Sequence, residues 1–253
     1  MLIYDGQGDS DNLTVVGTGG DDTIIHTPGV NDQAGTFQVN SLLALSYQNL
    51  GSGANLTADG GAGMDTLVYN GTAANDTFTL GSTGDVTLNS RLVLHTAGVE
   101  VLTLEGLAGD DRVNLSGSGN IVISGQEINL GGTIINSHVE ATYLTASGSD
   151  LLTYNGVSGV SENITVSSAG VKGGGQLSVP GETLVIFTGV EHIVVNGNDT
   201  EPDTLTFAGT NAADTFNINL AAAGTASDPV LQLLNSSGTA PPLPWTTTPT
   251  STH

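Results

Sequence analysis

The chain has 253 residues, of which 38% are hydrophobic, only 4% are aromatic and 36 are glycine, so we expect a core of thin aliphatic layers. The formal net charge of −22 disfavours binding to nucleic acid and to anionic membranes, and it favours divalent cations. The absence of cysteine excludes disulfide bonds and thiolate metal sites. No stretch is long and apolar enough to be a membrane-spanning helix.

Short segments of alternating apolar and polar residues follow one another along the chain. Residues 12–16 (NLTVV), 66–70 (TLVYN) and 204–208 (TLTFA) each follow a turn that ends in an aspartate. Further segments follow Val-Glu pairs that begin at Val99, Val139 and Val190. A spacing of two is typical of β-strands, and nothing in the chain has helical period.

The turn aspartates define a repeat. Successive units begin at Asp11, Asp65, Asp111, Asp150 and Asp203, which are 54, 46, 39 and 53 residues apart. The repeat is therefore degenerate, with units of about 40–54 residues, and it tolerates insertions and deletions. Because the pattern at Leu2 begins in the middle of a unit, we expect the chain to be a fragment of a longer array.

This pattern predicts an all-β fold, a right-handed parallel β-helix or β-solenoid over residues 1–234, followed by a Thr/Pro-rich linker or tail over 235–253. Variable unit lengths suit an open stack better than a closed propeller or an array of β-sandwiches. A coil of roughly 22 residues would place the acidic residues in columns, with Glu140 beside Glu162.

Acidic residues at the corners are the candidate metal ligands, because calcium takes six to eight oxygen ligands from carboxylates and turn carbonyls. The predicted calcium ligands are Asp22, Asp65, Asp76, Asp110, Asp111, Asp150, Asp203, Asp214, Glu100, Glu140 and Glu191. An equally weighted alternative is that each aspartate only closes its turn by accepting backbone N–H bonds. The histidines His26, His95, His138 and His192 are expected at the surface, and no catalytic constellation is found.

Residues Gly60–Val68, GGAGMDTLV, resemble the calcium-binding nonapeptide G-G-x-G-x-D-x-U-x of repeats-in-toxin (RTX) β-rolls. Segments 17–25 and 106–114 match this nonapeptide with one change, and 71–79 matches it more weakly. The whole unit, over residues 2 to 220, is similar to repeats of giant secreted surface proteins of the planctomycete and cyanobacterial type. That resemblance implies an extracellular, repetitive and non-catalytic role.

We therefore expect a structural or adhesive segment of a secreted protein at the bacterial cell surface, stabilised by calcium. Its expected partners are other copies joined end to end or cell-surface glycans, with no nucleic acid and no membrane insertion. Two alternatives are a β-helical polysaccharide lyase or hydrolase and a protein that binds ice or carbohydrate through threonine rows. The rows would contain Thr66, Thr77, Thr204 and Thr215.

Overall fold

The computed structural model describes residues 1–81, 84–147, 150–197 and 203–209, together with strand backbone at 216–219, 231–235 and 244–248. The described residues form strands and turns, which confirms the all-β prediction. They include no helix that is long and apolar enough to cross a membrane. The chain divides into two compact units: unit 1 comprises Met1–Leu115 and Gly132–Glu140, and unit 2 comprises Ser116–Gly131 and Ala141–His253.

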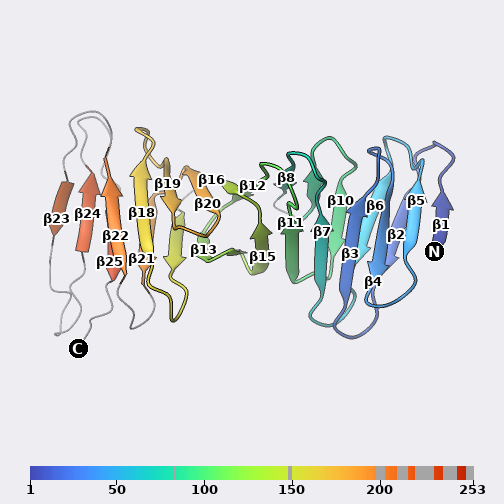
Figure 1. The fold of residues 1–253 in the computed structure, drawn as a ribbon, viewed down its shortest axis with the longest axis horizontal. Coiled ribbons are helices and arrows are strands. Elements are labelled where there is room, and N and C mark those ends of the chain that lie inside the picture. Colours follow the sequence, from blue (N-terminus) through green and yellow to red (C-terminus); the bar gives the residue numbers. More distant parts are fainter. Residues whose placement is uncertain are drawn as a thin grey trace. The chain divides into compact units, whose positions relative to one another are not determined.

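Unit 1 contains two mixed sheets, drawn from blue to green in Figure 1. One sheet has the order β1 (Leu2–Asp5), β5 (Leu45–Gln48), β4 (Gly35–Val39), β3 (Thr23–Pro28), β7 (Thr66–Asn70), β11 (Val101–Glu105) and β15 (Thr133–His138). The other has the order β2 (Asn12–Val16), β6 (Asn55–Asp59), β10 (Leu94–Ala97), β9 (Val86–Leu88), β8 (Thr77–Leu80) and β12 (Arg112–Gly117).

Unit 2 is built in the same way. One sheet has the order β14 (Glu127–Leu130), β13 (Asn120–Ser124), β17 (Leu151–Asn155), β21 (His192–Asn196), β25 (Pro244–Thr248), β24 (Leu231–Asn235) and β23 (Phe216–Asn219). The other has the order β16 (Ala141–Ala146), β20 (Leu184–Thr188), β19 (Gly175–Ser178), β18 (Asn163–Ser168) and β22 (Thr204–Ala208). Strand β24 ends at the first residue of the predicted linker, and β25 lies within it.

Each sheet contains both parallel and antiparallel pairs of strands. Pairs such as β3·β7, β7·β11 and β17·β21 are parallel and in register. The strands within β3–β5, β8–β10 and β18–β20 are antiparallel meanders. The prediction of parallel strands therefore holds between repeats and misses the meanders, whose strands have the same alternation of side chains as the parallel ones.

The meanders mark the repeat in three dimensions. In chain order, two single strands in different sheets precede each meander. Meanders begin with β3 at Thr23, β8 at Thr77, β18 at Asn163 and β23 at Phe216, and β13 begins midway between β8 and β18 at Asn120. These starts are 54, 43, 43 and 53 residues apart, so the degenerate repeat read from the aspartates corresponds to five strands.

The inner strands alternate buried and more exposed side chains, as β7 does with the buried Leu67 and Tyr69. The Tyr69 ring on β7 meets the Phe78 ring on β8 edge to face, with the ring centroids 5.7 Å apart. Since β7 and β8 belong to different sheets, this contact places the core of unit 1 between the sheets. The core is otherwise mainly aliphatic, as the composition predicts.

His26 lies in this core, so the prediction of a surface position is wrong for it. Its side chain is almost fully buried, and its Nε2 atom lies 2.8 Å from the Tyr47 hydroxyl oxygen. The rings of Phe37 and Tyr69 lie 4.6 and 4.5 Å from it, centroid to centroid. Burial, and secondarily the charge of Arg91, lowers the pKa of His26 to about 3, so this side chain is neutral near pH 7.

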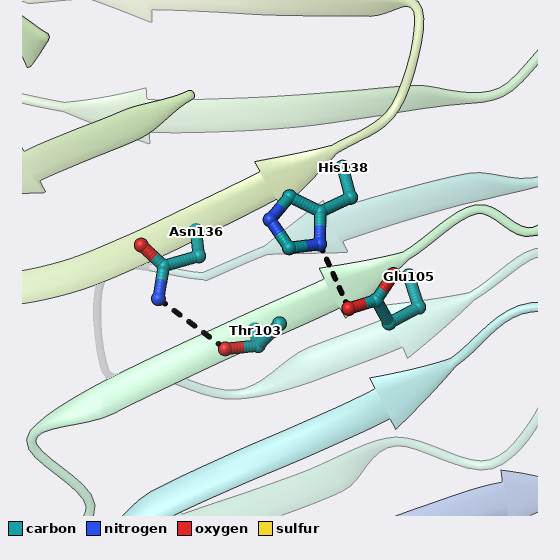
Figure 2. Close-up of polar contacts among 4 residues, drawn as sticks. All are labelled: Thr103, Glu105, Asn136 and His138. Atoms are coloured by element: carbon teal, nitrogen blue, oxygen red, sulfur yellow. Dashed lines mark hydrogen bonds and ion pairs between the residues drawn. The ribbon is translucent and has the colours of Figure 1, made fainter. Parts of the chain in front are cut away.

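The outer face of the same sheet has polar cross-strand pairs (Figure 2). On β11 and β15, the Asn136 amide donates to the Thr103 hydroxyl over 3.4 Å, and His138 Nδ1 lies 2.7 Å from Glu105 Oε1. Both members of the His138–Glu105 pair are partly exposed. Such exposed pairs contribute at most about 1 kcal/mol each, so they support the sheet without defining a site.

Candidate functional site

The predicted acidic residues of unit 1 form two hydrogen-bonded columns at the corners between the sheets. In the first, the Asp22 N–H donates to Asp65 Oδ1 over 2.7 Å, and the Asp65 N–H donates to Glu100 Oε2 over 2.8 Å. We call such a column a carboxylate ladder, because each acid accepts the main-chain N–H of the acid in the neighbouring turn.

The second carboxylate ladder of unit 1 has the same design. The Asp76 N–H donates to Asp111 Oδ1, and the Asp111 N–H donates to Glu140 Oε2, each over 2.7 Å. Ladder neighbours are 35 or 43 residues apart in the first ladder, and 35 or 29 apart in the second. The expected coil of about 22 residues is therefore wrong, because the two extra strands of a meander lengthen the chain between neighbouring turns.

Unit 2 contains two shorter carboxylate ladders. The Gly119 N–H donates to Asp150 Oδ1, and the Asp150 N–H donates to Glu191 Oε2 over 2.7 Å. The Glu162 N–H donates to Asp203 Oδ1 over 3.0 Å. Asp214 lies outside the described residues, so its predicted place in a ladder stays a prediction.

Each ladder acid that precedes a meander in unit 1 also closes its own turn. Asp22 Oδ2 accepts the Thr18 N–H over 2.5 Å and the Thr18 hydroxyl over 2.9 Å, and the Asn40 amide donates to Asp22 Oδ1. Asp76 repeats these bonds with Thr72 and Asn89. Both asparagines have positive φ, 50° at Asn40 and 53° at Asn89, a conformation that asparagine tolerates better than most residues.

A glycine makes room for each of these carboxylates. In unit 1, Gly17, Gly60, Gly71 and Gly106 stand five residues before a ladder aspartate. A Cβ atom at these glycines would lie 2.5–2.7 Å from the aspartate Oδ2, which is closer than real Cβ atoms come to other atoms. In unit 2 the spacing is six residues, from Gly156 to Glu162 and from Gly197 to Asp203. This glycine-to-acid spacing is the sequence signal that could have identified the ladders.

Ladder geometry sets the ionisation of two aspartates in opposite directions. The Thr18 N–H is the main cause that lowers the pKa of Asp22 below its usual value. Burial is the main cause that raises the pKa of Asp111, partly offset by the N–H of Asp76 and reinforced by the charge of Glu140. Main-chain N–H donors therefore lower the pKa of both aspartates, and at Asp111 the effect of burial is larger.

The described residues contain no group of three or more histidine, cysteine, aspartate or glutamate side chains arranged to hold a metal ion. The ladder carboxylates Asp22, Asp65, Asp76, Asp111 and Asp150 are almost fully buried, and each directs one oxygen at a main-chain N–H donor. The Oδ2 atoms of Asp65 and Asp150 are buried without a hydrogen-bond partner. Of the predicted ligands in unit 1, Asp110 and Glu140 are exposed. The Asp110 N–H donates to Asn75 Oδ1 over 3.0 Å, and Glu140 Oε2 accepts the Asp111 N–H. The contacts of Asp22 and Asp76 fit turn closure directly.

One acidic cluster in unit 2 was missed by the sequence reasoning. The Tyr154 hydroxyl lies 3.1 Å from Glu162 Oε1 and 3.1 Å from each carboxylate oxygen of Glu182. Glu162 Oε1 also accepts the Val157 N–H over 2.7 Å. Burial, with a smaller contribution from the charge of Glu162, raises the pKa of Glu182. Only the pairing of β18 with β19 and of β19 with β20 brings Glu182 to this position, so no local sequence signal indicates it.

Comparison with protein-family models, with curated protein sequences and with solved structures finds no match to this chain.

Proposed function

We propose that the chain is a non-catalytic structural segment, a β-solenoid of the right-handed parallel type with antiparallel meanders inserted. The observation that carries this proposal is the role of the ladder acids, whose oxygen atoms accept main-chain N–H bonds from their own and neighbouring turns. A carboxylate that accepts such bonds stabilises the backbone of the turns that it joins, which is a structural role. The preference for right-handed crossovers between parallel strands supports the right-handed form.

The structural role we propose is to keep the repeats in register. Burial of a carboxylate without donors costs several kcal/mol, so a ladder is stable only when the neighbouring turn supplies its N–H group. A slip of one strand by one residue would leave these buried oxygens unpaired and would also turn the apolar residues outward. The ladders therefore favour one register at each corner, which suits a long and regular surface segment.

The cellular part of the proposal is that this segment belongs to a secreted bacterial surface protein that acts in adhesion. Its support is the net charge of −22 and the similarity of residues 60–68 to repeats of secreted proteins. Antibody labelling of intact and of permeabilised cells tests this location. Labelling that occurs only after the cells are permeabilised would contradict a surface location.

Calcium is proposed to stiffen the segment through exposed acids at the corners, such as Asp110. Asp110 adjoins the buried ladder residue Asp111, whereas Oδ1 of the equivalent Asp21 accepts the Met64 N–H over 2.9 Å. An exposed carboxylate can offer oxygen to an ion together with turn carbonyls. The buried ladder acids would then stabilise the turns that carry the exposed acids.

Melting curves in millimolar calcium and in chelator distinguish calcium binding at exposed acids from the structural role of the buried ladder acids. If calcium binds the exposed corners, the midpoint rises with calcium in the parent chain, and Asp110→Asn reduces that rise. Asp111→Asn should instead lower the midpoint by a similar amount in both solutions. A midpoint that does not respond to calcium would overturn the calcium part alone, whereas cleavage of a polysaccharide by the purified chain would overturn the non-catalytic role.

A further inference from the structure

The first coil of unit 1 has an open edge with exposed apolar residues. Strands β1 and β2 are the terminal strands of their sheets, and among described strands β1 pairs only with β5 and β2 only with β6. Leu2 and Ile3 on β1 are 60% and 61% exposed, and Val16 on β2 is 59% exposed. Leu13 on β2 is only half-buried, whereas Leu67 at the same position of β7 is fully buried.

Unit 2 ends one of its sheets with a strand of the same kind. Among described strands, β22 pairs only with β18, through a parallel register that joins Leu205 to Ile164. Leu205 is half-buried and β22 has no charged residue and no proline. Proteins commonly protect edge strands with lysine, proline or bulges, so the sequence of β22 leaves this edge able to pair.

The parallel pairs inside each unit indicate which strands fit together. In β2·β6, β7·β11 and β17·β21, both strands end immediately before a glycine, and the last residues of the two strands are partners. Strand β22 ends at Ala208 before Gly209, and β1 ends at Asp5 before Gly6. The same register would place Leu205 beside Leu2 and Phe207 beside Tyr4.

The order of elements along the chain supports the same choice. The single strand that follows the meander β3–β5 is β6, which pairs with β2, and the one that follows β8–β10 is β11, which pairs with β7. After β23–β25, the position equivalent to β6 and β11 would be the parallel neighbour of β22. Strand β1 is equivalent to β6 and β11. Like them, it is followed directly by a glycine, and it leads into a turn closed by an acid, Asp11.

We propose that two copies of this chain associate head to tail, with β1 of one copy adding as a parallel strand to β22 of the next. The partner is a second copy because it supplies the matching alternation, register and turn glycine. The contact is heterologous, so each assembly keeps one open β1 and one open β22 and can grow further. The high negative charge of each copy opposes association over about 10 Å at 0.1 M salt, so added salt should strengthen it.

Sedimentation of the full chain over a range of concentration and salt tests the proposal. The parent should form species larger than a dimer, and the average mass should rise with salt. Leu2→Lys and Leu205→Lys should each weaken association at least tenfold, because each places a charge on the inward face of an edge strand. The matched outward substitutions Ile3→Lys and Thr206→Lys should have less effect, since alternate residues point to opposite faces.

Mixing gives the sharper result. Leu2→Lys keeps an intact β22 and Leu205→Lys keeps an intact β1, so an equimolar mixture should form a dimer that does not grow. A parent that stays monomeric at the highest soluble concentration would overturn the proposal and leave the structural role standing. Association that is lost in Leu2→Lys but unchanged in Leu205→Lys would also overturn it, because that pattern indicates two β1 edges pairing with each other.

The register is tested by cross-linking, which the absence of native cysteine makes unambiguous. In the proposed pair, Ile3 faces Thr206 on the outer side. A chain with Ile3→Cys mixed with one with Thr206→Cys should form an intermolecular disulfide on mild oxidation, because paired residues in neighbouring strands lie within disulfide reach. Faster cross-linking of Ile3→Cys with Thr204→Cys would refute the register.

Discussion

Asp76 offers the clearest test of the carboxylate ladders. It is almost fully buried and accepts three hydrogen bonds, from the Thr72 N–H at 2.5 Å, the Thr72 hydroxyl at 3.0 Å and the Asn89 amide at 2.7 Å. Asp76→Asn keeps the size of the side chain but replaces one acceptor oxygen with an NH₂ group. That group must point at either Thr72 or Asn89, both of which are donors.

The expected cost follows from these contacts. Losing one charge-assisted hydrogen bond costs about 1.5–3 kcal/mol, and a buried donor left without an acceptor costs about 1–3 kcal/mol. Because the side chain and its neighbours can relax, we expect Asp76→Asn to lower the free energy of unfolding by about 3 kcal/mol. The loss should be equal in calcium and in chelator, because the substitution removes acceptors for N–H and not a ligand for an ion.

Exchanging the two groups provides the control. In the double variant Asp76→Asn with Asn89→Asp, the new amide at 76 can donate to the new carboxylate at 89, and its oxygen can still accept the Thr72 N–H. The Thr77 N–H, which donates to Asn89 Oδ1 over 2.9 Å, keeps an acceptor. We expect the double variant to recover about 1–2 kcal/mol, a coupling typical of residues in direct contact.

Urea unfolding measures the global free energy, and amide hydrogen exchange at Thr72 measures the local one, since a repeat protein can open one turn without unfolding. The reasoning is refuted if Asp76→Asn changes stability by less than about 0.5 kcal/mol. It is also refuted if the loss disappears in chelator, which would identify Asp76 as an ion ligand.

Three further outcomes are expected. Gly106→Ala would place a Cβ atom 2.5 Å from Asp111 Oδ2, so it should destabilise the chain by about 1–3 kcal/mol, whereas Gly20→Ala, with nothing within 4 Å, should be nearly neutral in the same thermal melts. His26 has a folded pKa of about 3, below its usual 6.5, so its contribution is fully present above pH 6.5 and is lost as pH falls towards 3; His26→Leu should flatten the stability curve in that window. Glu182 has a raised pKa, so its contribution is lost as pH rises through that value; Glu182→Gln should be more stable than the parent at pH 7, and the difference should disappear in acid. A parallel pair of pH curves for either variant and the parent would contradict the corresponding assignment.

Local features of the fold were predictable because they depend on local chemistry. Alternation of apolar and polar residues located strands β2, β7 and β22 at 12–16, 66–70 and 204–208, as the structure has them. Glycine and aspartate in fixed order located the corners, because a buried carboxylate needs both N–H donors and the space that a Cβ atom would fill. The alternative in which the aspartates close turns describes Asp22 and Asp76 directly.

Tertiary structure decided what alternation cannot express. A strand has the same pattern of side chains whether its neighbour runs parallel or antiparallel, so the meanders, and with them the distance along the chain between ladder neighbours, were not readable from sequence. The same holds for His26, because alternation does not decide whether this side chain faces the core or the solvent. Burial beside Tyr47 makes it a neutral core residue. Pairing of distant strands also brought Glu182 to Tyr154.

The sequence alone therefore determined the strands, the corners and the acids that occupy them, since each depends on residues a few positions apart. Which acid lies beside which was decided only by the tertiary structure. Asp22 meets Asp65, and Asp76 meets Asp111, because inserted meanders set the distance along the chain between neighbouring coils. Whether a corner acid is buried or exposed was also decided by the tertiary structure, as the difference between buried Asp111 and its exposed neighbour Asp110 illustrates.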